Sequence, residues 1–202
     1  YSVTGVQTCA LPIWRGEADP DGHTALMLHE IDRMVERLEE FLDFARPRRK
    51  KEDRVQLGAL ATKTATLLRP DAEAAGITLD VRTADPSPVE VIGDAAALEE
   101  LVLNLTLNAI EASSTGGRVE LAVDLAPQGP RLRVTDAGHG IAPADLPRLF
   151  DPYFTTKEAG SGLGLAIARR IAEEHHAVLS LTNGGERGAV ATLQFPAEPG
   201  ES

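Results

Sequence analysis

The apolar residues between Ala25 and Arg46 recur at alternating intervals of three and four residues. The positions are Leu28, Ile31, Val35, Leu38, Leu42 and Ala45, and charged residues fill the other faces. This spacing predicts one helix with a coiled-coil seam. A single helix cannot bury such a seam, so we expect a partner helix to cover it. Pro47 ends the pattern, and a basic linker, residues 48–51, follows.

From Val55 onwards, helix and strand patterns alternate. Asp94 is placed to cap the second helix, and residues 137–160 are rich in loop-forming residues. The order of elements predicts an α+β fold: a two-layer sandwich whose mixed sheet is covered on one face by helices. The expected helices are residues 57–68, 95–113 and 163–175, and the expected strands are residues 77–81, 89–92, 118–125, 131–135, 178–182 and 189–195.

Composition narrows the possible partners. Of the 202 residues, 43% are hydrophobic, which is enough for one well-sized domain and an appendage. The net charge of −11 argues against nucleic acid or an anionic membrane as a partner. Cys9 is the only cysteine, which excludes an intrachain disulfide. No apolar run approaches the roughly 18 residues that span a bilayer. We therefore expect a soluble, cytoplasmic chain, with membrane attachment only through a region upstream.

The segment Tyr1–Ile13 fits nothing downstream. It has no charged residue and no initiator Met, and it resembles translated sequencing-adapter read-through. We therefore expect residues 1–24 to be disordered or artefactual, with native upstream sequence lost. The rest of the chain is expected to divide into a helix, residues 25–47, and a domain, residues 53–197.

Two asparagines stand out on the predicted helix 95–113. Asn104 and Asn108 are four residues apart and therefore share one helix face. Amides on an otherwise apolar helix need polar partners, and Mg²⁺ takes oxygen ligands while keeping several waters. The pair indicates a metal site, or alternatively two polar residues that are satisfied at a helix edge.

A carboxylate and two glycines follow the predicted strand 131–135. In the run Asp136-Ala137-Gly138-His139-Gly140, the carboxylate at the strand end can point into a pocket. The glycines allow positive φ and a close approach of a ligand to the backbone. The alternative is an ordinary Asp-Gly turn.

A second group of glycines, Gly160, Gly162 and Gly164, precedes the predicted helix 163–175. Backbone N–H groups at a helix N-terminus can bind an anion. The run is neither a Walker A loop nor a dinucleotide fingerprint, because it lacks Gly-Lys-Ser/Thr and a directly preceding parallel strand. Upstream, residues 150–157 carry aromatic residues that can anchor a lid, and Lys157 is a candidate phosphate ligand. The alternatives are a plain hinge and a surface loop with a solvated lysine.

Four segments together resemble the N, G1, F and G2 boxes of sensor histidine kinases. FLDFARP (41–47) is similar to the end of that family's second dimerisation helix, especially in its nitrogen- and dicarboxylate-sensing branch. The resemblance covers residues 26–196 and implies the gyrase-type ATPase sandwich. The four boxes are NLTLNAIEA (104–112), DAGHGI (136–141), LFDPYFTTK (149–157) and GSGLGLAI (160–167).

The resemblance implies ATP and Mg²⁺ as cofactors. Asn108 would ligate Mg²⁺, and Asn104 would lie beside the phosphates. Asp136 would accept a hydrogen bond from the adenine amine, and Lys157 would reach the γ-phosphate. Asn104 and Lys157 are thus the candidate catalytic residues. The implied partners are a second copy of the chain, through the dimerisation helices, and the receiver domain of a response regulator. The other implied nucleotide-binding positions are Gly138, Gly140, Ile141, Phe150, Thr156, Gly160, Ser161, Gly162, Leu163, Gly164 and Leu165.

The chain departs from the family at the phosphoacceptor histidine. In the family this residue opens an H-E/D-x-x-x-P segment on the first dimerisation helix. His29-Glu30 matches the opening, but the required proline does not follow. Only 15 residues separate His29 from Phe44, a single helical run of about 22 Å. We expect His29 to lie on the surface of the second helix and the acceptor helix to be missing. A smaller departure is Glu-His-His-Ala at residues 174–177, where the family usually has His-Gly-Gly.

Three functions remain open from the sequence. The first is an ATP-dependent protein-histidine kinase region, and the second is a nucleotide-binding interaction module without phosphotransfer. The third is a gyrase-like ATPase, with Glu100 as its catalytic glutamate four residues before Asn104. The FTTK lid and the coiled-coil linker favour the kinase.

Overall fold

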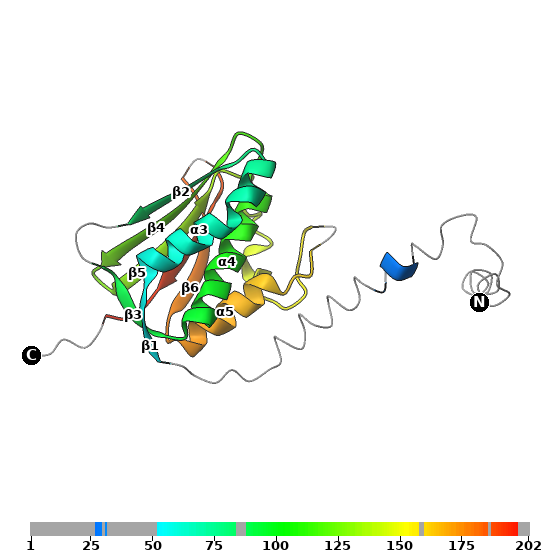
Figure 1. The fold of residues 1–202 in the computed structure, drawn as a ribbon. Helices are drawn as coiled ribbons and strands as arrows, with labels where there is room; N and C mark the ends of the chain where they lie inside the picture. Colours follow the sequence, from blue (N-terminus) through cyan, green and yellow to red (C-terminus); the bar gives the residue numbers. More distant parts are fainter. Residues whose placement is uncertain are drawn as a thin grey trace, which may run out of the picture. The chain divides into compact units, whose positions relative to one another are not determined.

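The computed structural model describes residues 27–29, 31, 52–83, 88–157, 160–185 and 187–197 (Figure 1). The chain divides into two units, Tyr1–Pro47 and Arg48–Ser202. In the first unit, residues 27–29 and 31 are helical. The rest of the predicted helix 25–47 and all of residues 1–24 lie outside the described residues, so the coiled coil stays a prediction.

The second unit is built on a five-stranded mixed sheet with the order β2-β4-β5-β7-β6. Strands β2 and β4 are parallel, and the other neighbours are antiparallel. A separate antiparallel pair joins β1 (Asp53–Gln56) to β3 (Glu90–Gly93). The strands of the large sheet are β2 (Thr78–Thr83), β4 (Arg118–Ala126), β5 (Gly129–Asp136), β6 (Val178–Asn183) and β7 (Ala189–Gln194).

Three helices lie on the same face of the large sheet: α3 (Leu57–Ala74), α4 (Ala95–Ala112) and α5 (Gly164–Glu174) (Figure 1). Leu98 and Leu101 of α4 and Leu121 and Leu132 of the sheet are fully buried in one core between the layers. Burial of each such side chain stabilises the fold by about 1.5–3 kcal/mol. The predicted α+β sandwich with helices on one face is confirmed.

The start of α4, which carries the asparagines, is held by a cap. Asp94 Oδ1 accepts hydrogen bonds from the backbone N–H groups of Ala96 (2.9 Å) and Ala97 (3.2 Å), as the sequence predicts. The N–H of Asp94 donates to His175 Nε2 at 2.9 Å, just after α5. Gly93 leaves room for this ring, because a Cβ at residue 93 would overlap it. The cap therefore links the start of α4 to the end of α5.

Helix α3 extends beyond its predicted end at Leu68 and includes Pro70. A proline inside a helix removes the N–H that would bond to the carbonyl four residues earlier, here that of Thr66. Thr66 is exposed, so water can satisfy this carbonyl. The exposed setting lowers the cost of the lost hydrogen bond.

The other differences concern short strands. The four-residue strand β1 was not predicted, because it buries only Val55 and shows too little alternation to be recognised. Strand β5 begins two residues before the predicted Arg131, since Ala126 pairs directly with Gly129 and the turn shortens to residues 127–128. The predicted loop 137–160 contains one 3₁₀ turn, η1 (Leu146–Arg148).

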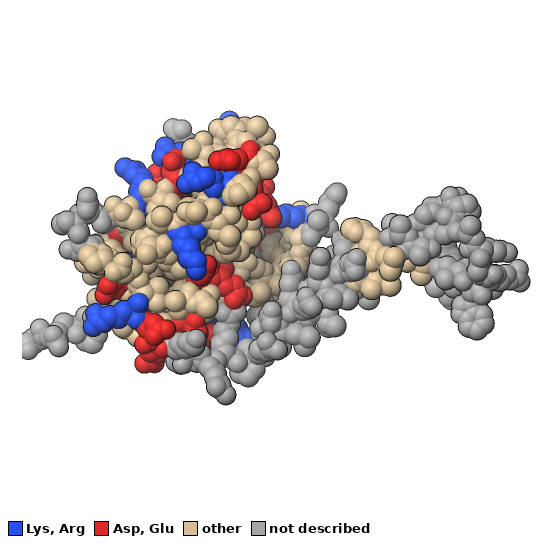
Figure 2. Space-filling view, viewed as in Figure 1, with Lys and Arg blue, Asp and Glu red and all other residues tan. Residues whose placement is uncertain are grey.

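Charged side chains of both signs alternate on the face of the molecule in Figure 2. Lys63 of α3 pairs with Glu99 of α4 at 2.6 Å, and Arg118 of β4 pairs with Asp80 of β2 at 2.9 Å. Exposed pairs of this kind contribute at most about 1 kcal/mol each. Such surface pairs therefore add little to the stability that the buried apolar side chains provide. Across the described residues, none of the helices is both long and apolar enough to traverse a lipid bilayer.

Candidate functional site

Asn104 and Asn108 are half-buried on the side of α4 that faces the start of α5. A Cβ added to Gly164, the first residue of α5, would lie 3.3 Å from Asn104 Oδ1 and 3.8 Å from Asn108 Nδ2. The absence of a side chain at Gly164 therefore keeps the amides beside the N-terminus of α5. This arrangement brings the first predicted motif and the last predicted motif together.

Lys157 extends from the loop before α5 to the same asparagines. Its ammonium group donates to Asn108 Oδ1 at 3.2 Å and forms an ion pair with Glu111, one turn further along α4. Asn108 and Lys157 are 49 residues apart in sequence. The structure therefore places a cation directly at the amide oxygen that the sequence singles out as a metal ligand.

Asp136 closes β5 and is one of the few buried polar side chains, with 8% of its surface exposed. The backbone N–H groups of Gly138 (2.9 Å) and Ala189 (3.1 Å) both donate to its Oδ1. A Cβ at Gly188 would overlap the Asp136 carbonyl, and one at Gly138 would overlap the carbonyl of Ala112. The two glycines thus let Asp136 lie close to the end of α4. Among the described residues, both bonds end on Oδ1, which leaves Oδ2 to accept from a ligand.

The loop after β5 is held by a side chain from another strand. Asn183 of β6 accepts from the N–H of Ile141 at 2.6 Å and donates to its carbonyl at 2.9 Å. Gly140 adopts φ +74°, a conformation that glycine reaches without strain. This two-bond clamp fixes the run from Gly138 to Ile141 against the sheet.

The loop before α5 folds back on itself. The N–H of Tyr153 donates to the carbonyl of Gly162 at 3.0 Å, and Gly162 has φ +70°. A Cβ at Gly162 would lie 2.5 Å from the Tyr153 carbonyl carbon, so only glycine fits. The guanidinium of Arg148 lies 4.6 Å from the Phe154 ring centre, and that of Arg169 lies 5.4 Å from the Phe150 ring centre. These contacts position the loop that delivers Lys157.

The N-terminus of α5 supplies a positive electrostatic end to the same place. Its first turn contains no acidic residue, and free backbone N–H groups there favour an anion. Gly160 and Ser161 are half-buried just before it, and the hydroxyl of Ser161 accepts from the N–H of Leu163 at 3.4 Å. Lys157 and this helix end thus place two positive groups beside Asn104 and Asn108.

Four of the predicted nucleotide-binding positions differ from the others in the burial or the contacts of their side chains. Leu163 is only 2% exposed, and Leu165 packs against the core, so a ligand could reach mainly their backbone. The half-buried ring of Phe150 lies against Arg169, and Thr156 is exposed. The remaining predicted residues surround the region between the end of β5, the middle of α4 and the start of α5.

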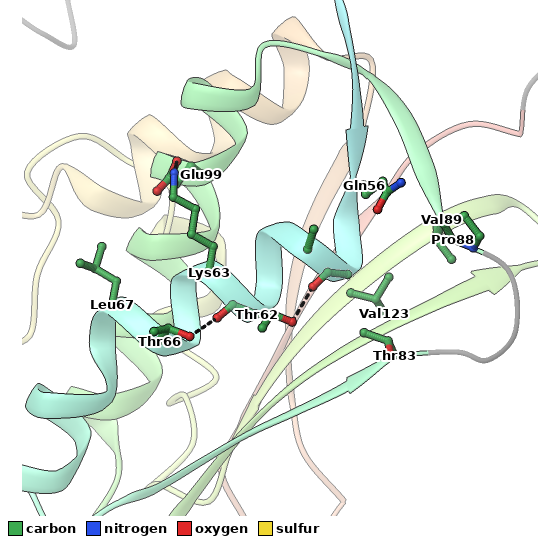
Figure 3. Close-up of a pocket in the computed structure, with 12 residues that line it drawn as sticks. Gln56, Thr62, Lys63, Thr66, Leu67, Thr83, Pro88, Val89, Glu99 and Val123 are labelled. Carbon is green, nitrogen blue, oxygen red and sulfur yellow. Dashed lines mark hydrogen bonds and ion pairs between the residues drawn. The ribbon is translucent and has the colours of Figure 1, made fainter.

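A groove of about 890 Å³ lies on a different part of the domain (Figure 3). Mainly apolar groups form it, between α3 and the ends of β2 and β3. Its charged residues, Lys63 and Glu99, point toward each other and pair at 2.6 Å. Among the described residues that line the groove, no set of unpaired charges converges to receive a triphosphate. None of the predicted site residues lines this groove; its walls include Gln56, Gly58, Ala59, Thr62, Thr66, Leu67, Thr83, Pro88, Val89 and Val123.

Three residues of the site were missed by sequence reasoning. Asn183 and Gly188 come from the hairpin between β6 and β7, which the sequence marks only as a turn. Their roles depend on strand pairing that brings residue 183 beside residue 141, so no local signal reveals them. Glu111 had a signal: it lies three residues after Asn108 and therefore on the same helix face.

The fold and the groups gathered on α4 and α5 define an ATP-binding α/β sandwich. The chain belongs to the family described as "Histidine kinase-, DNA gyrase B-, and HSP90-like ATPase", which matches residues 93–199, just over half of the chain. Within that family its relatives are histidine kinases. Sensor histidine kinase ZraS of Escherichia coli (strain K12) is 33% identical over 184 residues, which cover 90% of this chain and 39% of ZraS. The chain therefore spans well under half of that relative.

Two solved structures show the same fold. The crystal structure of full-length ShkA in complex with AMPPNP has a TM-score of 0.73 and 25% identity, covering 90% of this chain and 40% of ShkA. Histidine kinase ThkA in complex with the response regulator protein TrrA has a TM-score of 0.74 and 24% identity, covering 98% of this chain and 59% of ThkA. The resemblance to histidine kinases is confirmed: this chain contains their ATP-binding catalytic domain.

Proposed function

We propose that this chain is the catalytic region of a protein-histidine kinase in a two-component system. It would bind ATP with Mg²⁺ and transfer the γ-phosphoryl group to a histidine, for relay to the receiver domain of a response regulator. Because the chain covers 39% of ZraS, both the transfer and the partners belong to the proposal. Its site of action would be the cytoplasm, where ATP is available.

The observation that carries the proposal is the meeting of Lys157 with Asn108. One comes from a glycine-flanked loop and the other from the middle of α4, yet the ammonium nitrogen lies 3.2 Å from the amide oxygen. Asn104 lies one turn away, beside the N-terminus of α5. Amide oxygen, ammonium and helix N-terminus are the groups that a metal-chelated phosphate chain requires.

At the adenine end, Asp136 is the candidate for base recognition. Its burial and its two backbone donors hold the carboxylate in one orientation. The remaining oxygen, Oδ2, would accept from the exocyclic amine of adenine. A buried acceptor of this kind discriminates strongly, because a base without the donor would leave it unpaired.

At the phosphate end, Mg²⁺-ATP would supply the phosphoryl group and a metal that neutralises part of its charge. Asn108 would hold the metal, and Lys157 would move from Asn108 to the γ-phosphate oxygens. The N–H groups at the start of α5 and the glycines before it would bind the other phosphates. The protein would thus act by positioning and by electrostatic stabilisation of the transferred group.

The match to the histidine kinase ZraS covers 90% of this chain, which supports the kinase over the gyrase-like ATPase. The acceptor imidazole would come from the first dimerisation helix of the same protein or of a second copy. We expect the dimer to form through the helices that include residues 25–47. The alternative of a nucleotide-binding interaction module makes the same prediction for binding and differs only in transfer.

The test is the affinity for ATP with and without Mg²⁺, measured by isothermal titration calorimetry. The wild-type chain should bind ATP more tightly with Mg²⁺, and Asn108→Ala should lose most of that metal-dependent gain. Gln128→Ala, in the exposed turn between β4 and β5, is the matched control and should behave as wild type. Equal metal-dependent gains in Asn108→Ala and wild type would contradict the role of Asn108.

A further inference from the structure

Glu111 lies one turn after Asn108 on the same face of α4, and nothing in the motifs assigns it a function. Its carboxylate, 54% exposed, pairs with the Lys157 ammonium, which also donates to Asn108 Oδ1 at 3.2 Å. The Lys157 ammonium is thus bound by two side-chain oxygens, one from Asn108 and one from Glu111. The ammonium marks the place where the oxygens of residues 108 and 111 converge.

The Asn108 amide offers Mg²⁺ one neutral oxygen, which leaves room for further ligands around the ion. Mg²⁺ in proteins is usually held by one or two carboxylates together with substrate phosphates, and it keeps several waters. Asp136, the buried carboxylate of the site, already accepts hydrogen bonds from two backbone N–H groups. It is the last residue of β5 and lies near the end of α4. Glu111 is the carboxylate whose oxygen shares a cationic partner with Asn108.

We infer that Glu111 is a second protein ligand of the metal, directly or through one of its waters, beside Asn108. This inference rests on the proposed function and adds a residue to its site. When the nucleotide binds, Lys157 would leave the two oxygens for the γ-phosphate, and the metal would replace the ammonium between them. Glu111 would keep a cationic partner throughout, because the metal would take the place that the ammonium leaves.

A different role for Glu111 would have a distinct signature. If Glu111 only holds Lys157 away from the phosphates, its neutralisation frees the lysine for ATP whether or not metal is present. Nucleotide affinity would then rise by the same factor with Mg²⁺ and with EDTA. If Glu111 ligates the metal, only the affinity with Mg²⁺ falls. The ratio of the two affinities therefore separates the roles.

The experiment measures the dissociation constant of AMPPNP by calorimetry over a series of Mg²⁺ concentrations and in EDTA. The variants are Glu111→Gln, which keeps shape and removes charge, and Glu111→Asp, which keeps charge on a shorter side chain. Glu73→Gln is the matched control, since Glu73 is an exposed helix carboxylate on α3, outside the candidate site. Thermal unfolding monitored by circular dichroism verifies that each variant is folded.

We expect Glu111→Gln to reduce the metal-dependent gain in affinity about tenfold or more. Its affinity in EDTA should not decrease, and Glu111→Asp should recover part of the gain. Glu73→Gln should match wild type. A Glu111→Gln variant with an unchanged gain overturns the inference alone. A wild-type chain with no metal-dependent gain overturns the proposed function as well.

Discussion

At the level of single residues, the chain uses a strained conformation at His176. This residue follows α5 with φ +56°, and its N–H donates to the carbonyl of Glu173 at 3.1 Å. Positive φ costs a residue with a side chain about 1–2 kcal/mol, and glycine avoids most of that cost. His176 belongs to the run 174–177, which departs from the His-Gly-Gly that is usual in the family. The departure noted in the sequence therefore has a stability cost.

We predict that His176→Gly stabilises the domain. Relief of the positive-φ strain should raise the free energy of unfolding by about 1 kcal/mol, partly offset by the greater flexibility of the unfolded chain. The measurement is urea denaturation followed by circular dichroism. Glu173→Gly, within α5, is the control and should destabilise. A variant with lower unfolding free energy than wild type would show that the His176 side chain stabilises more than its backbone strains.

At the level of elements, the hairpin of β4 and β5 delivers Asp136 to the site. Asp124 on β4 accepts two hydrogen bonds from Arg131 on β5, at 2.8 and 2.9 Å, and a third from Arg133 at 3.0 Å. The hydrogen bond from Arg131, together with the charges of Arg131 and Arg133, lowers the pKa of the Asp124 carboxyl below its ordinary value. The pair therefore stabilises the folded hairpin while Asp124 is ionised.

This lowered pKa predicts a pH dependence. The stabilisation that ionised Asp124 contributes is fully present above the pKa that this carboxyl has in the unfolded chain. It is lost as the pH falls through the lower pKa that the carboxyl has in the folded state. Asp124→Asn should cost up to about 1 kcal/mol at neutral pH, because the pair is partly exposed, and the difference should shrink below about pH 4. Urea denaturation at several pH values measures it. Asp151→Asn, whose carboxylate is 62% exposed and 3.9 Å from Arg148, is the control. A cost that persists at pH 2 would contradict this account.

The elements also show how far sequence reasoning extends. Helix α4 was predicted to within a residue, because its cap, its apolar spacing and its two asparagines are local signals. Strand β1 was not predicted, because it depends on pairing with β3. The extension of α3 past Leu68 was not predicted either, because it depends on water access at Thr66. Residues of the candidate site could be proposed from the sequence where they lie in contiguous motifs. Asn183 and Gly188 reach it only through sheet pairing, which no local pattern specifies.

At the level of the whole molecule, the proposal separates nucleotide binding from phosphate acceptance. The catalytic unit, Arg48–Ser202, holds every predicted nucleotide ligand, whereas the two N-terminal histidines, His23 and His29, belong to the other unit. His29 is exposed in a helical segment and lies too close to Phe44 for a two-helix hairpin. An acceptor outside this chain stays a prediction from the sequence.

We predict that the chain, incubated with Mg²⁺ and ATP labelled at the γ-phosphate, binds ATP without labelling itself. The measurement is autoradiography after gel electrophoresis, with acid treatment to distinguish phosphohistidine from phosphoester. His29→Gln is the control and should not alter the result. Acid-labile label that disappears in His29→Gln would identify His29 as the acceptor and overturn the expected separation.

The central claim is that α4, the end of β5 and the start of α5 form one nucleotide site. The most direct test is two-dimensional ¹⁵N NMR of the chain titrated with AMPPNP and Mg²⁺. We predict large shifts at the amides of residues 104, 108, 138–141 and 160–165. The amides of Gly58, Ala59, Thr62 and Thr66 in the separate groove of about 890 Å³ should stay unchanged. Shifts confined to that groove, with residues 108, 138 and 162 unaffected, would contradict the account.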